Sequence, residues 1–438
     1  MIFSLPIPVF FLLFLPLFFP ASRALSSKRG GSFFWALSPV FLFFVLLLLL
    51  LIFHSSCTLC QSLPREGLLL SLALAATFLA YLPALPLEER RSPAPILMPA
   101  VLSLGTGVFL QGSQSGVLAG GGLLALSLLF SVLFLGGAYP GAYQKFFPVR
   151  LGGAVLALGA LSFPAMRQSL TELLLVLAAA ILLLLPAPFP RRTETVLSPG
   201  FLRADQALFV CLPPLLIFHI LRAIPGGGLS ISPMLPGLGI LLALTGLLYA
   251  KISLFVEEMA EGLTVAGTGF LLAGFLTFRP EGREGALFMA LLLPLSTALS
   301  GLSLSFLAQR FRNRTFQGLA GQGTGVEPLR LAYLFGAFQG MSLPVVGGFL
   351  GEWILLRAVS ESSLVLSILA VVGIFLVFVL VLGRTVGLFS GEPVQRLSEQ
   401  DTCLASEILP SEGWSLWLAS TFLLAIDLLG TFGLGGGR

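Results

Sequence analysis

Charged residues are scarce in this sequence. Asp, Glu, Lys and Arg make up 10% of its 438 residues, against about 25% in a typical soluble domain. Hydrophobic residues make up 56%, and the mean hydropathy is +1.00. A chain of this composition cannot cover a water-facing surface, so a soluble protein is excluded. We expect membrane lipids around it, and no nucleic acid.

Metal-ligating residues are also scarce, with four cysteines and two histidines in the whole chain. Cys57 and Cys60 have the spacing of half a zinc or redox site, but no second Cys or His pair stands at a matching distance. Two small residues at a loop end are the other interpretation of this pair. No haem, zinc or iron–sulfur pattern can be assembled. We therefore expect no metal and no cofactor in this chain, and any redox cofactor would be held by a partner.

Long apolar runs are abundant, and they predict membrane-spanning helices. About 20 apolar residues cross the ~30 Å hydrocarbon core of a bilayer, and a hydropathy window gives about 14 such spans. Outer-membrane barrels alternate polar and apolar residues, unlike the almost unbroken leucine run at 45–54. The predicted fold class is an all-α polytopic membrane protein. Its predicted spans are 1–21, 33–53, 67–85, 95–111, 117–139, 150–166, 170–187, 204–222, 233–250, 252–276, 285–309, 328–356, 362–388 and 413–434.

Helix breakers interrupt two of these spans. Pro213 and Pro214 lie in the middle of span 204–222, and span 328–356 contains Pro344 followed by Gly347 and Gly348. Broken membrane helices are tolerated where the freed backbone groups meet protein or water, and they mark transport sites in many carriers. A simple kink is the alternative, because Gly and Pro are common in membrane helices.

Ionisable residues inside spans are the candidate functional groups, because each costs about 2.5–3.5 kcal/mol on insertion scales. Span 252–276 follows Lys251 and carries Glu257, Glu258 and Glu261. Lys251 opens this helix in our prediction, so it lies two turns from Glu258 on one stripe. Carboxylates this close repel one another, so we expect at least one to hold a proton near neutral pH. Alternatively, the helix begins later, and Glu257 and Glu258 lie among the lipid headgroups.

Three more ionisable residues stand alone. Glu352 follows the break in span 328–356 directly, which favours a role in transport over a place at the membrane surface. His219 has a side chain that suits proton passage, although a packing role is the alternative. Asp427, in the last span, is expected at the membrane surface.

The region from Lys251 to Leu356 resembles the antiporter-like subunits of respiratory complex I. Glu327–Pro328, Tyr333–Phe338, Met341–Pro344 and Gly348–Trp353 follow the pattern of that family's twelfth helix: an apolar half-helix, a small-Leu-Pro break, then Phe-x-Gly and a charge. The charge is Lys in subunits 2 and 5 and Glu in subunit 4, so Glu352 matches subunit 4. Lys251 matches the Lys that opens the family's tenth helix, and Glu261 falls where the family has His. The resemblance implies inverted five-helix repeats with broken helices.

The first half of the chain departs from this family. The family's charged residues of helices five, seven and eight align with Leu135, Ala179 and Pro214, and its helix-eleven His aligns with Thr297. Either the alignment fails there, or the chain has lost most of the first half-channel. In the second case, His219 and the glutamates of span 252–276 stand in for the missing charges, or the subunit pumps poorly. The resemblance implies four regions: helices 1–4 at 1–111, a degenerate first half-channel at 112–232, a second half-channel at 233–390, and a loop with the last helix at 391–438.

The function implied by the resemblance is proton translocation in the membrane arm of NADH:ubiquinone oxidoreductase. Neighbouring antiporter-like subunits would be its partners, and other subunits would hold NADH, flavin, iron–sulfur clusters and quinone, while this chain binds phospholipids. A structural subunit that has lost pumping and a standalone cation/proton antiporter are the alternatives. Most of the 24 basic residues fall in loops that follow odd-numbered spans. The positive-inside rule then predicts that these loops face the matrix, or a bacterial cytoplasm, and that both termini lie on the opposite side. Together with the resemblance, this implies a mitochondrial inner-membrane protein with both termini in the intermembrane space.

Overall fold

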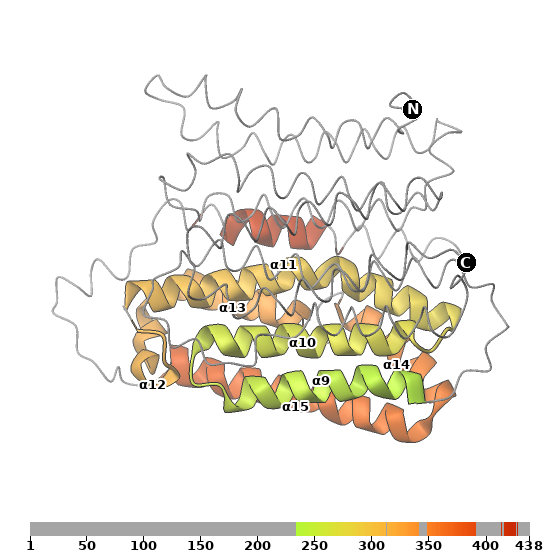
Figure 1. The fold of residues 1–438 in the computed structure, drawn as a ribbon. Coiled ribbons are helices and arrows are strands. Elements are labelled where there is room, and N and C mark those ends of the chain that lie inside the picture. The colour runs from blue at the N-terminus through green and yellow to red at the C-terminus, as the bar shows by residue number, and fades with distance from the viewer. Residues whose placement is uncertain are drawn as a thin grey trace, which may run out of the picture.

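The computed structural model describes residues 234–311, 313–340 and 348–390, together with 413, 416–425 and 427. Every regular element in these ranges is a helix, and most of the helices lie roughly side by side (Figure 1). The bounds are α9 (Met234–Ile252), α10 (Val256–Phe275), α11 (Pro280–Arg310), α12 (Phe316–Leu319), the 3₁₀ turn η6 (Gln322–Gly325), α13 (Glu327–Gly340), α14 (Gly348–Ser362) and α15 (Leu364–Phe389). A further short helix spans Leu416–Ala425.

Helices α9 and α10 form an antiparallel pair held together by small residues. Each helix presents Gly and Ala at alternating spacings of four and three, which places them on one face. A Cβ on Gly246 would lie 2.6 Å from the Ala266 amide nitrogen, and one on Gly262 would lie 2.6 Å from that of Ala250. Small residues let membrane helices approach to backbone contact. The two faces, here called the α9–α10 seam, consist of Gly239, Ala243, Gly246 and Ala250 on α9 and Gly262, Ala266, Gly269 and Ala273 on α10.

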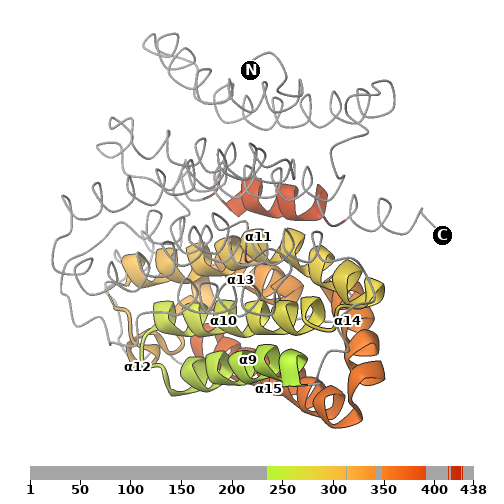
Figure 2. The same cartoon turned by 45° about the vertical axis from the view of Figure 1, so that its right-hand side comes forward.

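Helix α11 is the central helix of the described bundle. Over its apolar window, 89% of the residues are buried, and α10, α13 and α14 all pack against it. A helix that is apolar on every side is stable only when it is surrounded. It begins at Pro280, a residue suited to the first helical turn because its missing amide would have no partner there. Figure 2 shows α11 between α10 and the short C-terminal helix.

The span predicted at 328–356 consists of two helices. Helix α13 ends at Gly340 and α14 begins at Gly348. The Gly348 amide donates to the side-chain oxygen of Gln339 at 3.2 Å, whereas nine residues of unbroken α-helix would hold the two about 13 Å apart. A side chain at Gly348 would also collide with the Gln339 carbonyl oxygen. Gly348 therefore lies against Gln339, and one straight helix does not join α13 to α14. Pro344 and Gly347 themselves lie outside the described residues.

Helix α15 forms an exposed apolar side of the bundle. Only 22% of its apolar window is buried, and its exposed residues include Leu364, Phe375 and Val386. Among the described residues, α9, α11 and α15 are long and apolar enough to cross a membrane. The ends of α9, α11 and α15 and the starts of α10 and α13 meet at one end of the bundle. This end, here called the basic end, carries Lys251, Arg310, Arg314, Arg330 and Arg384.

The structure corrects the predicted start of the tenth span. Lys251 lies in the last turn of α9, and α10 begins only at Val256. Phe255 is extended and pairs with Thr315, while the Val256 amide donates to the Arg314 carbonyl. The turn at Ser253–Phe255 is too apolar for a hydropathy window to separate it from the helices on either side. The prediction that Lys251 lies on one helical stripe with Glu258 is therefore wrong.

Candidate functional site

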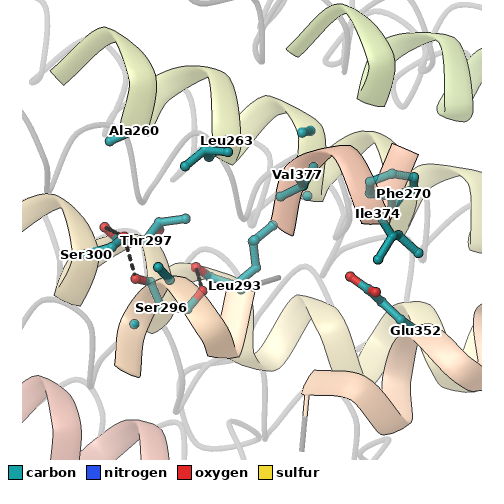
Figure 3. A pocket seen from close by; sticks show the side chains of 15 residues that line it. Ala260, Leu263, Phe270, Leu293, Ser296, Thr297, Ser300, Glu352, Ile374 and Val377 are labelled. Atoms are coloured by element: carbon teal, nitrogen blue, oxygen red, sulfur yellow. Dashed lines mark hydrogen bonds between the residues drawn. The ribbon is translucent and has the colours of Figure 1, made fainter. Parts of the chain in front are cut away.

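A small cavity lies where α10, α11, α13, α14 and α15 meet. About 30 Å³ of it is open to the centres of water molecules, enough for roughly two waters at ~10–15 Å³ each. Its lining is mostly apolar, with one carboxylate and three hydroxyl groups. The Glu352 carboxylate points into it from one side, and the hydroxyls of Ser296 and Ser300 stand on the other side of Leu293 (Figure 3).

Close helix packing buries Glu352. The residue lies on the first turns of α14 and is 3% exposed. A Cβ on Gly285 of α11 would lie 2.7 Å from the Gly351 carbonyl oxygen, and one on Gly351 would lie 3.0 Å from the Phe288 ring. These glycines bring α14 against α11 and leave the next side chain, Glu352, directed at the cavity.

The hydroxyl groups of the site come from one stretch of α11. Ser296 Oγ donates to the Leu293 carbonyl at 2.9 Å, Thr297 Oγ1 to that of Pro294 at 2.9 Å, and Ser300 Oγ to that of Ser296 at 2.9 Å. Because these bonds use the hydroxyl protons, the oxygen lone pairs are the groups that can accept hydrogen bonds from water. The cavity wall thus offers acceptors opposite a carboxyl group.

Gln339 joins both sides of the helix break to the C-terminal helix. It is 2% exposed. Its amide nitrogen donates to Asp427 Oδ2 at 3.0 Å, while its oxygen accepts from the Gly348 amide. Asp427, which we expected at the membrane surface, is half-buried against this glutamine. Sequence patterns gave no signal for Gln339, because its partners are 9 and 88 residues away.

The glutamates of α10 do not share the cavity with Glu352. Glu258 is half-buried and Glu261 is 7% exposed, but neither lines the cavity. Glu261 lies on a different face of α10 from Leu263 and Gly267, which do line it. Glu257 is in the first turn of α10. Protonation of this cluster stays a prediction.

The remaining predicted site residues lie elsewhere. Lys251 is exposed at the end of α9, while His219, Pro213 and Pro214 lie outside the described residues. Within the described ranges, no three His, Cys, Asp or Glu side chains are placed to hold a metal ion. The absence of a cofactor from this chain is an expectation that this observation does not test.

The fold is similar to that of two multisubunit membrane assemblies. The chain resembles a chain of the membrane-bound sulfane sulfur reductase, an archaeal respiratory membrane complex, with a TM-score of 0.72, 16% identity, and coverage of 97% of this chain and 76% of that chain. It also resembles a chain of the Mrp complex from Dietzia sp. DQ12-45-1b, with a TM-score of 0.60, 17% identity, and coverage of 84% and 79%. No protein-family model matches the sequence, and no curated protein does.

These likenesses define the class of protein. The chain is an all-helical, multi-pass membrane protein with the antiporter-like fold found in such complexes. At these identities the comparison concerns the fold alone. What the chain transports, and with which partners, has to be argued from the site.

Proposed function

We propose that the chain is a proton-translocating subunit of a respiratory membrane complex, the counterpart of subunit 4 in the membrane arm of complex I. The observation that carries the proposal is Glu352, a buried carboxyl group at a water-sized cavity directly after a broken helix. The likeness to an archaeal respiratory membrane complex supports the same assignment.

The site has the chemistry for holding and passing a proton. A permanently charged carboxylate is costly inside a membrane protein, so a buried Glu that exchanges protons with neighbouring water is the less costly arrangement. The cavity has room for about two waters, and the lone pairs of Ser296 and Ser300 can orient them. A proton that leaves Glu352 can therefore move to a water that these hydroxyls hold.

The redox chemistry belongs to partner subunits in this proposal. Those partners hold NADH, flavin, iron–sulfur clusters and quinone, and they pass the energy of electron transfer to the membrane arm. This chain contacts neighbouring antiporter-like subunits and phospholipids. Its proposed location is the mitochondrial inner membrane, with both termini in the intermembrane space.

The decisive experiment is Glu352→Gln in the assembled complex, reconstituted in vesicles and driven by NADH. We expect proton translocation per NADH oxidised to fall by roughly tenfold or more, because a positioned proton-transfer group contributes ~10²–10⁴-fold when nothing replaces it. Glu361→Gln is the matched control. Glu361 lies on the same helix, but its side chain is 41% exposed, in surface pairs with Arg279 and Arg357.

The outcomes separate the candidate functions. Loss of translocation in Glu352→Gln with normal pumping in Glu361→Gln supports the proposal. Wild-type pumping in both variants, within a complex that oxidises NADH, would instead support the role of a structural subunit that does not pump. Sodium-driven proton exchange by the purified chain alone, with no NADH oxidation in the native particle, would support the function of a standalone antiporter.

A further inference from the structure

A second buried polar group lies on α13, outside the lining of the cavity. Tyr333 is fully buried, and its ring stacks on Phe389 of α15 with centroids 5.8 Å apart. Its hydroxyl lies beside Thr385 and near Arg384, yet within the described residues it makes no hydrogen bond of good geometry. Buried hydroxyls are nearly always satisfied in native proteins, so this one requires an explanation.

The packing of α11 against α13 places Tyr333 about one helical turn from Gly336, which lines the cavity. Gly340 faces Ser296, and Gly336 faces Ser300, so the two helices run antiparallel. The same register places Ser303 opposite Tyr333. Ser303 is fully buried, and its hydroxyl proton is used by the Leu299 carbonyl at 2.8 Å.

Three serine hydroxyl groups therefore lie in a row along one face of α11. Ser296, Ser300 and Ser303 are spaced by four and three residues, and together they cover about 10 Å along the helix axis at ~1.5 Å per residue. The first two line the cavity. The third lies at the level of Tyr333.

The opposite side of Tyr333 leads to the basic end of the bundle. Thr385 Oγ1 donates to the Val381 carbonyl at 2.7 Å, which leaves its lone pairs available to a neighbouring donor. The next residue toward the surface is Arg384, whose guanidinium donates to the carbonyls of Lys251 and Ser253 at the end of α9. Lys251 is exposed. Polar groups thus continue from Tyr333 to the surface.

We propose that the Tyr333 hydroxyl is a proton relay between the Glu352 cavity and the basic end of the bundle. In each transfer Tyr333 gives its proton to the Thr385 oxygen, which turns from the Val381 carbonyl and releases its own hydroxyl proton to a water on the basic side, and Tyr333 takes a proton from a water on the cavity side. It ends with one O–H bond, as it began, and no bond to carbon changes. This inference rests on the proposed function and adds the side from which the cavity exchanges protons.

The test is Tyr333→Phe in the assembled, NADH-driven complex. The substitution removes only a hydroxyl that has no good hydrogen bond, and it keeps the ring stack on Phe389, so the complex should assemble. We expect proton translocation to fall on the order of tenfold. The ratio of translocation rates in H₂O and D₂O should rise, because transfer past α13 becomes limiting; a loss of packing alone would not change this ratio.

Two control variants isolate the hydroxyl. Tyr249→Phe makes the same chemical change on α9 and should pump as the wild type. Phe389→Leu removes the ring partner but keeps the Tyr333 hydroxyl, and it should also retain translocation. Thr385→Val removes the neighbouring hydroxyl and should reduce translocation in the same way as Tyr333→Phe.

The result that would overturn the inference is wild-type translocation in Tyr333→Phe while Glu352→Gln is blocked, and the proposed function would then still stand. If Glu352→Gln itself pumps normally, the proposed function fails first. If Tyr333→Phe does not assemble, Thr385→Val decides: reduced translocation supports the relay, and unchanged translocation refutes it.

Discussion

Gln339 provides the sharpest test of how the broken helix is held. Gln339→Leu keeps the size of the side chain but removes one bond to the Gly348 amide and one to the Asp427 carboxylate. Interhelical hydrogen bonds in membrane proteins contribute about 0.6 kcal/mol on average and up to ~1.7. Loss of both, with a buried amide left unsatisfied, should destabilise the protein by about 1–3 kcal/mol. In a water-soluble protein, one hydrogen bond to a charged group and one to a neutral group would together contribute more to the free energy of unfolding.

The measurement is the thermal stability of the detergent-solubilised complex, combined with protease release of a tag placed after the C-terminal helix. Gln339→Leu should lower the transition temperature and speed tag release. Gln339→Glu should do the same, because two carboxylates then face each other. Adding Asp427→Asn to Gln339→Glu should restore stability, since the exchanged pair can again donate and accept. If Gln339→Leu matches the wild type, or the double variant is no better than Gln339→Glu alone, the proposed contact does not hold the break.

Two further predictions concern packing. Gly262→Ala should destabilise the protein by about 1–3 kcal/mol, as overpacking does, because its Cβ would lie 2.6 Å from the Ala250 nitrogen; Gly383→Ala, with nothing within 4 Å, is the control and should gain up to ~1 kcal/mol. Thermal unfolding compares the two, and equal stability would refute the seam. Arg384→Met should expose the α9–α10 turn to trypsin cleavage after Lys251, because it removes the two carbonyl contacts and the stacking on Phe316; unchanged cleavage would contradict this role.

Hydropathy predicted the spans that are apolar along their whole length. The spans at 233–250 and 362–388 match α9 and α15 closely. The hydropathy window failed at helix ends, because a helix can begin with polar residues and a turn can consist of apolar ones. Pro280–Gly285 begins α11 despite its polar residues, and Ser253–Phe255 interrupts the helix despite its apolar ones.

The candidate site was predictable only where a charge stood out from its surroundings. Glu352 could be found because a carboxylate after a broken membrane helix is costly. Ser296, Ser300 and Tyr333 carry no such signal, since single hydroxyls are common in membrane helices and become meaningful only when another helix faces them. The α10 glutamates stood out equally well, but periodicity alone could not tell that their helix turns another face to the cavity.

The α9–α10 seam limits how the bundle can move. Its small residues recur every seven positions on both helices, so the pair fits only in registers about 10 Å apart. A slide along the axis would move each glycine of the seam away from the backbone that it contacts. This packing opposes a shift of α10 by an ångström or two along α9, of the kind that sliding helices make elsewhere. Any change in cavity volume must move α9 and α10 together as one body, or come from the other helices that line the cavity, α11, α13, α14 and α15.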